Sequence, residues 1–193
     1  MNYPNNLKKN KNGFINYGNR GMLLENILNN TNQHYLENDI AIIYKKPTPI
    51  GINKVGYENN RKIIKSAYFS SPSTLDYNGI YKSKYIEFDA KESSNKTSFP
   101  LSNIHEHQTI HIKKIIKHGG ICFLIIKMND IIYLLDGKDY IDFLNNNSRK
   151  SIPINYLNNF AFKIPIKLNQ TINYLEVIEN IYFKENSNEE KND

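Results

Sequence analysis

Alternating apolar and polar residues predict a β-strand near the middle of the chain. In YIEFDAKE, residues 85–92, an apolar side chain stands at every second position from Ile86 to Ala90, the period of a strand with one buried face. Asp89 and Lys91 belong to the other set, so we expect both to project from the face away from the apolar side chains. An acid and a lysine placed together on such a face call for a chemical explanation.

The rest of the pattern predicts a mixed α/β fold with a central β-sheet. Apolar residues at helical spacing predict a helix that begins at Asn19 and another over residues 104–118, with Ile112, Ile115 and Ile116 inward. Further short helices and strands are expected over residues 41–46, 119–127, 131–136, 139–147 and 172–183. Residues 91–103 read as a polar connection, and residues 149–168 read as an irregular return.

The stretch PTPIGINKVGYENNRKIIKSAYFSSPS, which follows the first predicted strand, does not fit this scheme. It contains three prolines and two glycines and has no clear core face. It is too long for an ordinary connection, and long ordered excursions are commonly functional. We therefore expect an insertion at about residues 46–70 within a single domain over 19–183. Residues 1–18 are expected to form a flexible basic arm and residues 184–193 a disordered acidic tail.

Length and composition are those of a globular protein with one domain. The chain has 193 residues, of which 39% are hydrophobic. The longest apolar run, residues 121–126, is too short to span a bilayer, and the N-terminal residues lack the apolar segment of a secretory signal. Cys122 is the single cysteine, so an internal disulfide is impossible. We expect a soluble, cytoplasmic protein with no membrane partner.

Positive charge is concentrated in two stretches of the chain. The net charge is +6, residues 1–20 contain four basic residues and no acid, and residues 44–74 contain six basic residues against Glu58 alone. Clustered basic charge attracts polyanions by releasing their counterions, which points to nucleic acid. A general bias toward Lys, Asn and Ile in the composition would produce part of the same excess.

The predicted hairpin around residues 76–92 places two carboxylates opposite each other. If the turn is centred on Lys82 and Ser83, Asp76 faces Asp89 across the strand pair. Facing carboxylates repel each other, but a divalent cation bound between them makes the arrangement favourable. Mg²⁺ typically uses one or two carboxylates as ligands. Lys91 could then stabilise the charge that develops on a phosphate under attack. A surface hairpin with merely solvated charges is the alternative.

The order of an acid, a short gap and an acid-x-Lys resembles the PD-(D/E)XK nuclease superfamily. More closely, the chain is similar to the RecU family of Holliday junction resolvases. The similarity rests on NRGMLLE, TNQHYLE, KKPTPI, AYFSSPSTLDYNGIY, YIEFDAKE, NKTSFPL, HEHQ, GGICFLI and KSIPINYL, which occur in the family's order between residues 19 and 157. It implies a mixed sheet flanked by helices, a restriction-endonuclease-like core with a protruding stalk.

The resemblance also implies roles for particular residues. Thr74, Asp76, Asp89 and Gln108 match the family's Mg²⁺-binding positions, Mn²⁺ being an expected substitute, and Lys91 matches its transition-state-stabilising lysine. Catalysis would rest on Asp76, Asp89 and Lys91. The family's usual acid before this lysine is Glu, and here it is the shorter Asp89. That difference bears on the placement of the metal rather than on the reaction.

The substrate implied by the resemblance is a four-way DNA junction, cut symmetrically by a homodimer during recombination and repair. Residues 46–70 correspond to the stalk, and the DNA contacts are expected from Arg20, Lys46, Arg61, Lys62 and Lys65. A recombinase and a branch-migration helicase are possible partners. A hairpin flap that closes over the core is the alternative interpretation of residues 46–70.

Other interpretations of the chemistry are weaker. His105, His107 and His111 could suggest zinc, but no cysteine joins them and two lysines follow. Glu25 on the first predicted helix could add an acid to the site, although a surface position is the simpler interpretation. A protein that binds and remodels junctions without cleavage is the main alternative function. A sequence-specific restriction-type nuclease is disfavoured because the resemblance extends through the stalk.

Overall fold

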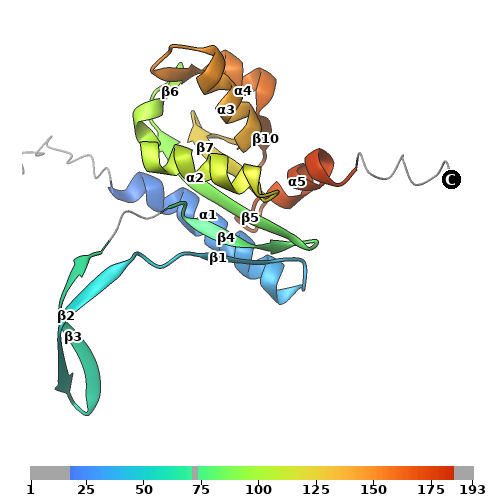
Figure 1. The fold of residues 1–193 in the computed structure, drawn as a ribbon. Coiled ribbons are helices and arrows are strands. Elements are labelled where there is room, and N and C mark those ends of the chain that lie inside the picture. The colour runs from blue at the N-terminus through green and yellow to red at the C-terminus, as the bar shows by residue number, and fades with distance from the viewer. Residues whose placement is uncertain (1–17, 71–73, 185–193) are drawn as a thin grey trace, which may run out of the picture.

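The computed structural model describes residues 18–70 and 74–184, except for the side chains of residues 18–22, and is built on a six-stranded mixed β-sheet (Figure 1). The strand order is β1-β4-β5-β7-β8-β10, and only β5 and β7 run parallel among the paired strands. Their bounds are Ile42–Lys45, Tyr77–Tyr81, Lys84–Ser93, Ile121–Met128, Ile131–Asp136 and Phe162–Ile164, respectively. The predicted mixed α/β fold is confirmed.

Helices cover both faces of this sheet (Figure 1). Helices α1 (Gly18–Glu37) and α5 (Tyr174–Tyr182) pack on one face, where Leu24, Leu28 and Ile178 join Phe88 and Phe123 in the first hydrophobic core. Helices α2 (Glu106–Lys117), α3 (Gly137–Asn146) and α4 (Ile154–Phe160) pack on the other, around a second core that includes Ile112, Leu124 and Phe143. The central strands are therefore buried on both faces.

This double burial corrects one expectation about β5. The face that carries Glu87 and Asp89 was expected to lie open, yet the two residues are only 1% and 0% exposed. Helix α2 is the crossover that joins the parallel strands β5 and β7, and it lies over this face of the sheet (Figure 1). The polar face of β5 is thus an interior polar layer.

The hairpin turn between β4 and β5 sets the register that the site depends on. Lys82 and Ser83 have φ angles of 45° and 63°, so both adopt the left-handed conformation of a two-residue type I′ turn. Tyr81 pairs with Lys84 and Tyr77 pairs with Phe88. The predicted pairing across the hairpin is confirmed, although neither turn residue is glycine.

Helix α2 ends in a glycine motif that directs the chain into β7. Gly119 has a φ of +78°, and its N–H donates to Ile116 O at 3.0 Å, while Gly120 N–H donates to Ile115 O at 3.0 Å. This pair of bonds is the Schellman arrangement, in which glycine accommodates the left-handed residue after the helix. The motif ends α2 shortly before the most buried strand begins.

The segment expected to be an irregular return is regular in part. Residues 149–168 contain β9 (Ser151–Pro153), α4 and β10, and β10 adds an antiparallel edge strand to β8. Strand β9 pairs with β6 (Ser98–Pro100), which is followed by the short 3₁₀ helix η1 (Leu101–Asn103). Strands β6, β9 and β10 have three residues each, too few to show a period in the sequence, so the sequence does not predict them.

Residues 46–70 form a two-stranded antiparallel hairpin that extends away from the helices and the sheet (Figure 1). Strand β2 (Ile50–Glu58) pairs with β3 (Arg61–Phe69), and Asn59 and Asn60 form the tip with φ angles of 49° and 60°. Most of its side chains are exposed, including Tyr57 and Phe69. A flap closed over the core is not what the structure shows.

The predicted arm and tail lie almost entirely outside the described residues. The arm covers residues 1–18, of which the structure describes only the backbone of Gly18, and the tail covers 184–193, of which it describes Lys184. Across 18–70 and 74–184, no helix combines the length and the apolar character that a membrane crossing requires.

Candidate functional site

A pair of carboxylates lies where β4 begins and β5 approaches its end. The register Tyr77–Phe88 and Asn78–Glu87 continues to Asp76 opposite Asp89, with Asp76 one residue before β4. Asp76 is half-buried, whereas Asp89 is fully buried. The two acids that the sequence placed opposite each other are therefore neighbours, as predicted.

Asp89 is held in place by several donors. Its Oδ2 accepts a hydrogen bond from Gln108 Nε2 at 2.7 Å and lies 2.9 Å from Lys91 Nζ, and its Oδ1 accepts from Ala90 N at 2.9 Å. Burial and, to a smaller extent, the neighbouring Asp76 carboxyl raise the pKa of Asp89 from 3.8 to about 7, and this value includes the opposing effect of Lys91. The pair is electrostatically unfavourable unless a proton or a cation joins it.

Gln108 connects Asp89 to the segment before β4. Its Nε2 donates to Thr74 O at 2.9 Å as well as to Asp89, and its Oε1 accepts from His105 N at 3.1 Å in a capping arrangement at the start of α2. The amide nitrogen thus faces the carboxylate. Coordination of a metal by Gln108 Oε1 would require the amide to rotate and give up its bond to His105.

The oxygen atoms around this pair fit a hard divalent cation. The backbone carbonyl of Thr74, the carboxylates of Asp76 and Asp89 and the amide of Gln108 offer oxygen ligands, and Mg²⁺ prefers such ligands with only one or two carboxylates. Within the described residues, no group of three or more His, Cys, Asp or Glu side chains lies close enough together to hold a metal. The ring of His105 stacks on the ring of His107, with 5.5 Å between the ring centroids.

Glu87 is the buried acid that the sequence interpretation did not assign. It shares the α2 side of β5 with Asp89, and its carboxylate pairs with Lys46, accepts from Tyr85 Oη at 2.7 Å and lies 2.9 Å from His111 Nε2. Burial alone would raise the pKa of Glu87, but the bonds from Lys46, Tyr85 and His111 outweigh it and lower the pKa. The alternation of residues along β5 puts Glu87 on the same face as Asp89, and this pattern could have identified Glu87 from the sequence.

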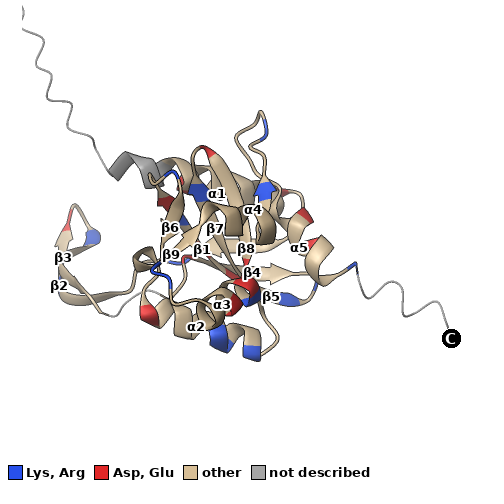
Figure 2. Cartoon of the chain, turned by 90° about the horizontal axis from the view of Figure 1, so that it is seen from above, with Lys and Arg blue, Asp and Glu red and all other residues tan. Residues whose placement is uncertain are grey.

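The residues expected to contact DNA fall into different environments. Lys46, at the base of the β2–β3 hairpin, is turned inward: its Nζ donates to Thr74 Oγ1 at 2.7 Å and pairs with Glu87. Arg61, Lys62 and Lys65 lie on β3 with exposed side chains, on the hairpin that projects from the body (Figures 1 and 2). Arg20 lies in α1, and its side chain is among those not described.

Glu25 approaches the site from the other face of the sheet. Its carboxylate lies 2.5 Å from Lys45 Nζ, and both side chains are exposed by about two-fifths. Together with Asp76 and Glu92 they line a cavity of about 140 Å³ beside β4 and β5. Glu25 is therefore paired with Lys45 and shares this cavity with Asp76.

Sequence and structure comparisons identify relatives of the chain. Three curated relatives are named Holliday junction resolvase RecU. The one from Geobacillus sp. (strain WCH70) is 48% identical over 87% of each chain. The one from Oceanobacillus iheyensis is 45% identical over 95% of this chain and 100% of the relative. The one from Bacillus subtilis (strain 168) is 47% identical over 89% of this chain and 85% of the relative.

The solved structure of Hjc, a Holliday junction resolvase from Archaeoglobus fulgidus, aligns with 72% of this chain and 94% of its own, at 8% identity and a TM-score of 0.41. The family model for Recombination protein U matches residues 19–180, a range that includes the carboxylate pair, Lys91 and the projecting hairpin. The chain belongs to the RecU family.

Proposed function

We propose that this protein is a Mg²⁺-dependent endonuclease that resolves four-way DNA junctions in recombination and repair. The observation that carries the proposal is the buried Asp89 beside Asp76, with Lys91 Nζ 2.9 Å away. The names of its relatives supply the substrate class, since they are Holliday junction resolvases.

In this proposal each group has a task. Thr74, Asp76, Asp89 and Gln108 would hold Mg²⁺, or Mn²⁺ in its place, which when bound polarises a phosphodiester and makes water more acidic. Lys91 is one-fifth exposed, so its ammonium group reaches the surface where DNA would lie while remaining anchored to Asp89. A fixed cation there stabilises the negative charge that develops on the phosphate.

A junction-binding protein without cleavage is the alternative, and the carboxylate pair argues against it. Burying Asp89 next to a second carboxylate raises its pKa and destabilises the fold in the absence of a cation. A protein that only bound DNA would gain nothing from this arrangement, because carboxylates repel the phosphate backbone. A metal-dependent nuclease needs it.

Cleavage of a labelled four-way junction and of a linear duplex, with Mg²⁺ or with EDTA, tests the proposal. We expect cutting of the junction with Mg²⁺ only, and a loss of about 10²–10³-fold or more in rate for Asp76→Asn, Asp89→Asn and Lys91→Ala. Lys84→Ala, an exposed lysine at the start of the same strand, is the matched control and should cut normally. Full cleavage in EDTA, or a normal rate for Lys91→Ala, would refute the proposal.

Resolution of a junction needs two cuts on opposed strands, so we also propose a homodimer that acts in the cytoplasm. A two-fold dimer presents two identical sites to a substrate of matching pseudo-symmetry. Ile42, Tyr44 and Ile80 give the outer strands β1 and β4 an exposed apolar surface that fits such an interface. A recombinase and a branch-migration helicase are the partners we propose for the pathway.

A further inference from the structure

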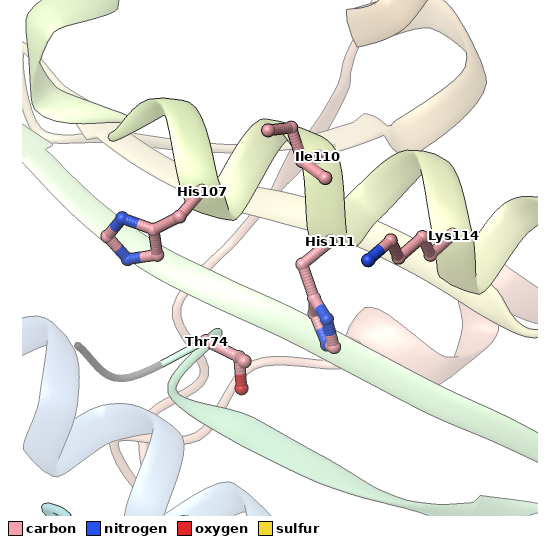
Figure 3. A pocket seen from close by; sticks show the side chains of 5 residues that line it. All are labelled: Thr74, His107, Ile110, His111 and Lys114. Atoms are coloured by element: carbon pink, nitrogen blue, oxygen red, sulfur yellow. The ribbon is translucent and has the colours of Figure 1, made fainter. Parts of the chain in front are cut away.

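A groove runs along α2 beside the carboxylate pair. It has a volume of about 280 Å³ and is lined by Thr74, His107, Ile110, His111 and Lys114 (Figure 3). Four of these residues come from α2, where positions 107, 111 and 114 recur on one side of the helix. Thr74 faces them from the segment before β4, and the imidazole of His111 points toward it (Figure 3).

Thr74 joins this groove to the candidate metal centre. Its carbonyl oxygen accepts from Gln108 Nε2, which also binds Asp89, while its hydroxyl accepts from Lys46 Nζ at 2.7 Å. The backbone of this one residue thus belongs to the carboxylate site, and its side chain lines the groove. A strand of DNA with its reacting phosphate at the carboxylate pair would therefore pass close to the groove.

The chemistry of the lining suits an anion. Its polar groups are two imidazoles, one ammonium and one hydroxyl, and no lining residue is an acid. The nearest acid is Glu87, which contacts His111. Glu87 is only 1% exposed and is already paired with Lys46. Lys114 is exposed and forms no ion pair with any of the residues that the structure describes.

We propose that this groove binds a backbone phosphate of the cleaved strand next to the one that reacts, with Lys114 and His107 as its contacts. The inference rests on the proposed nuclease function. Phosphate contacts of this type fix the register of a protein on DNA without reading sequence. The groove therefore sets which phosphodiester reaches the carboxylates, and Ile110, about half exposed, offers an apolar contact for the sugar.

Binding measurements over a range of salt concentrations test the groove. The variants are Lys114→Ala and His107→Ala, with Lys113→Ala as the matched control. Lys113 is the neighbouring exposed lysine and lines a different groove, with Lys117 and Lys138. In EDTA, Lys114→Ala should weaken junction binding several-fold and reduce the log–log salt slope by about 0.9, the value for one phosphate contact. Lys113→Ala should leave the slope unchanged, and Lys114→Arg should restore it.

Mapping the cut positions supplies a second measurement, because a general loss of positive charge would weaken binding without changing where the DNA is cut. With Mg²⁺ and saturating DNA, Lys114→Ala and His107→Ala should cut at dispersed positions, whereas Lys113→Ala should keep the wild-type pattern. The groove assignment fails if Lys114→Ala matches Lys113→Ala in both salt slope and cut position. If wild-type protein binds junctions but does not cut them, the nuclease proposal fails. A slope change confined to the groove variants would then still support the phosphate site.

Discussion

Replacing Asp89 with asparagine should remove a pH-dependent loss of stability from the metal-free protein. Asp89 is fully buried, and burial together with Asp76 raises its pKa from 3.8 to about 7. Between these two values the folded protein keeps a proton that the unfolded chain has released. The free energy of unfolding therefore falls as pH rises through this window and is lowest above about pH 7.

The size of the effect follows from the displacement of the pKa. Each pH unit across the window is worth about 1.4 kcal/mol, which sets an upper limit of about 4 kcal/mol. The pKa of about 7 already includes the effects of Lys91 and Asp76, and a range from about pH 4 to about pH 8 covers most of the window, so we expect a change of about 2–4 kcal/mol. The asparagine also turns one amide N–H₂ toward Ala90 N or Gln108 Nε2, at a cost of about 1–3 kcal/mol that does not vary with pH.

Urea unfolding in EDTA, followed by far-ultraviolet circular dichroism because the chain has no tryptophan, measures this difference. The stability of wild type relative to Asp89→Asn should fall by about 2–4 kcal/mol between about pH 4 and about pH 8. Asp142→Asn, which removes an exposed carboxylate on α3, should run parallel to wild type. Adding Mg²⁺ at about pH 8 should stabilise wild type more than Asp89→Asn. Parallel curves for wild type and Asp89→Asn would refute the reasoning.

Three further predictions concern the surroundings of the site. Glu87→Ala should lower the free energy of unfolding by about 3–5 kcal/mol, because Lys46 and His111 lose their buried partner. Urea unfolding measures this, and a loss below about 1 kcal/mol would contradict it. Neutralising Arg61, Lys62 and Lys65 together should lower the salt slope of junction binding by about 0.9 for each lost phosphate contact, and an unchanged slope would mean that β3 does not touch the DNA backbone. Light scattering should give twice the chain mass of 22.6 kDa, and Ile80→Glu should halve the measured value. A wild-type monomer that releases singly nicked junctions would count against the dimer.

The sequence by itself determined the local geometry of the carboxylate pair. A period of two over residues 85–91 defined a strand, and a turn centred on Lys82 and Ser83 placed Asp76 opposite Asp89, as the observed pairing confirms. Such features are local, because alternation and turn position fix which residues of a hairpin face each other. The long helices and the buried strands followed from periodicity for the same reason.

Only the tertiary structure decided what surrounds that pair. No pattern within β5 shows that α2 lies over its polar face, yet this packing buries Glu87 and Asp89 and raises the pKa of Asp89. The inward turn of Lys46, the link from Gln108 to Thr74 and the short strands of residues 149–168 have the same origin. Burial and long-range pairing join residues far apart in the chain, so a period measured over a few residues carries no record of them.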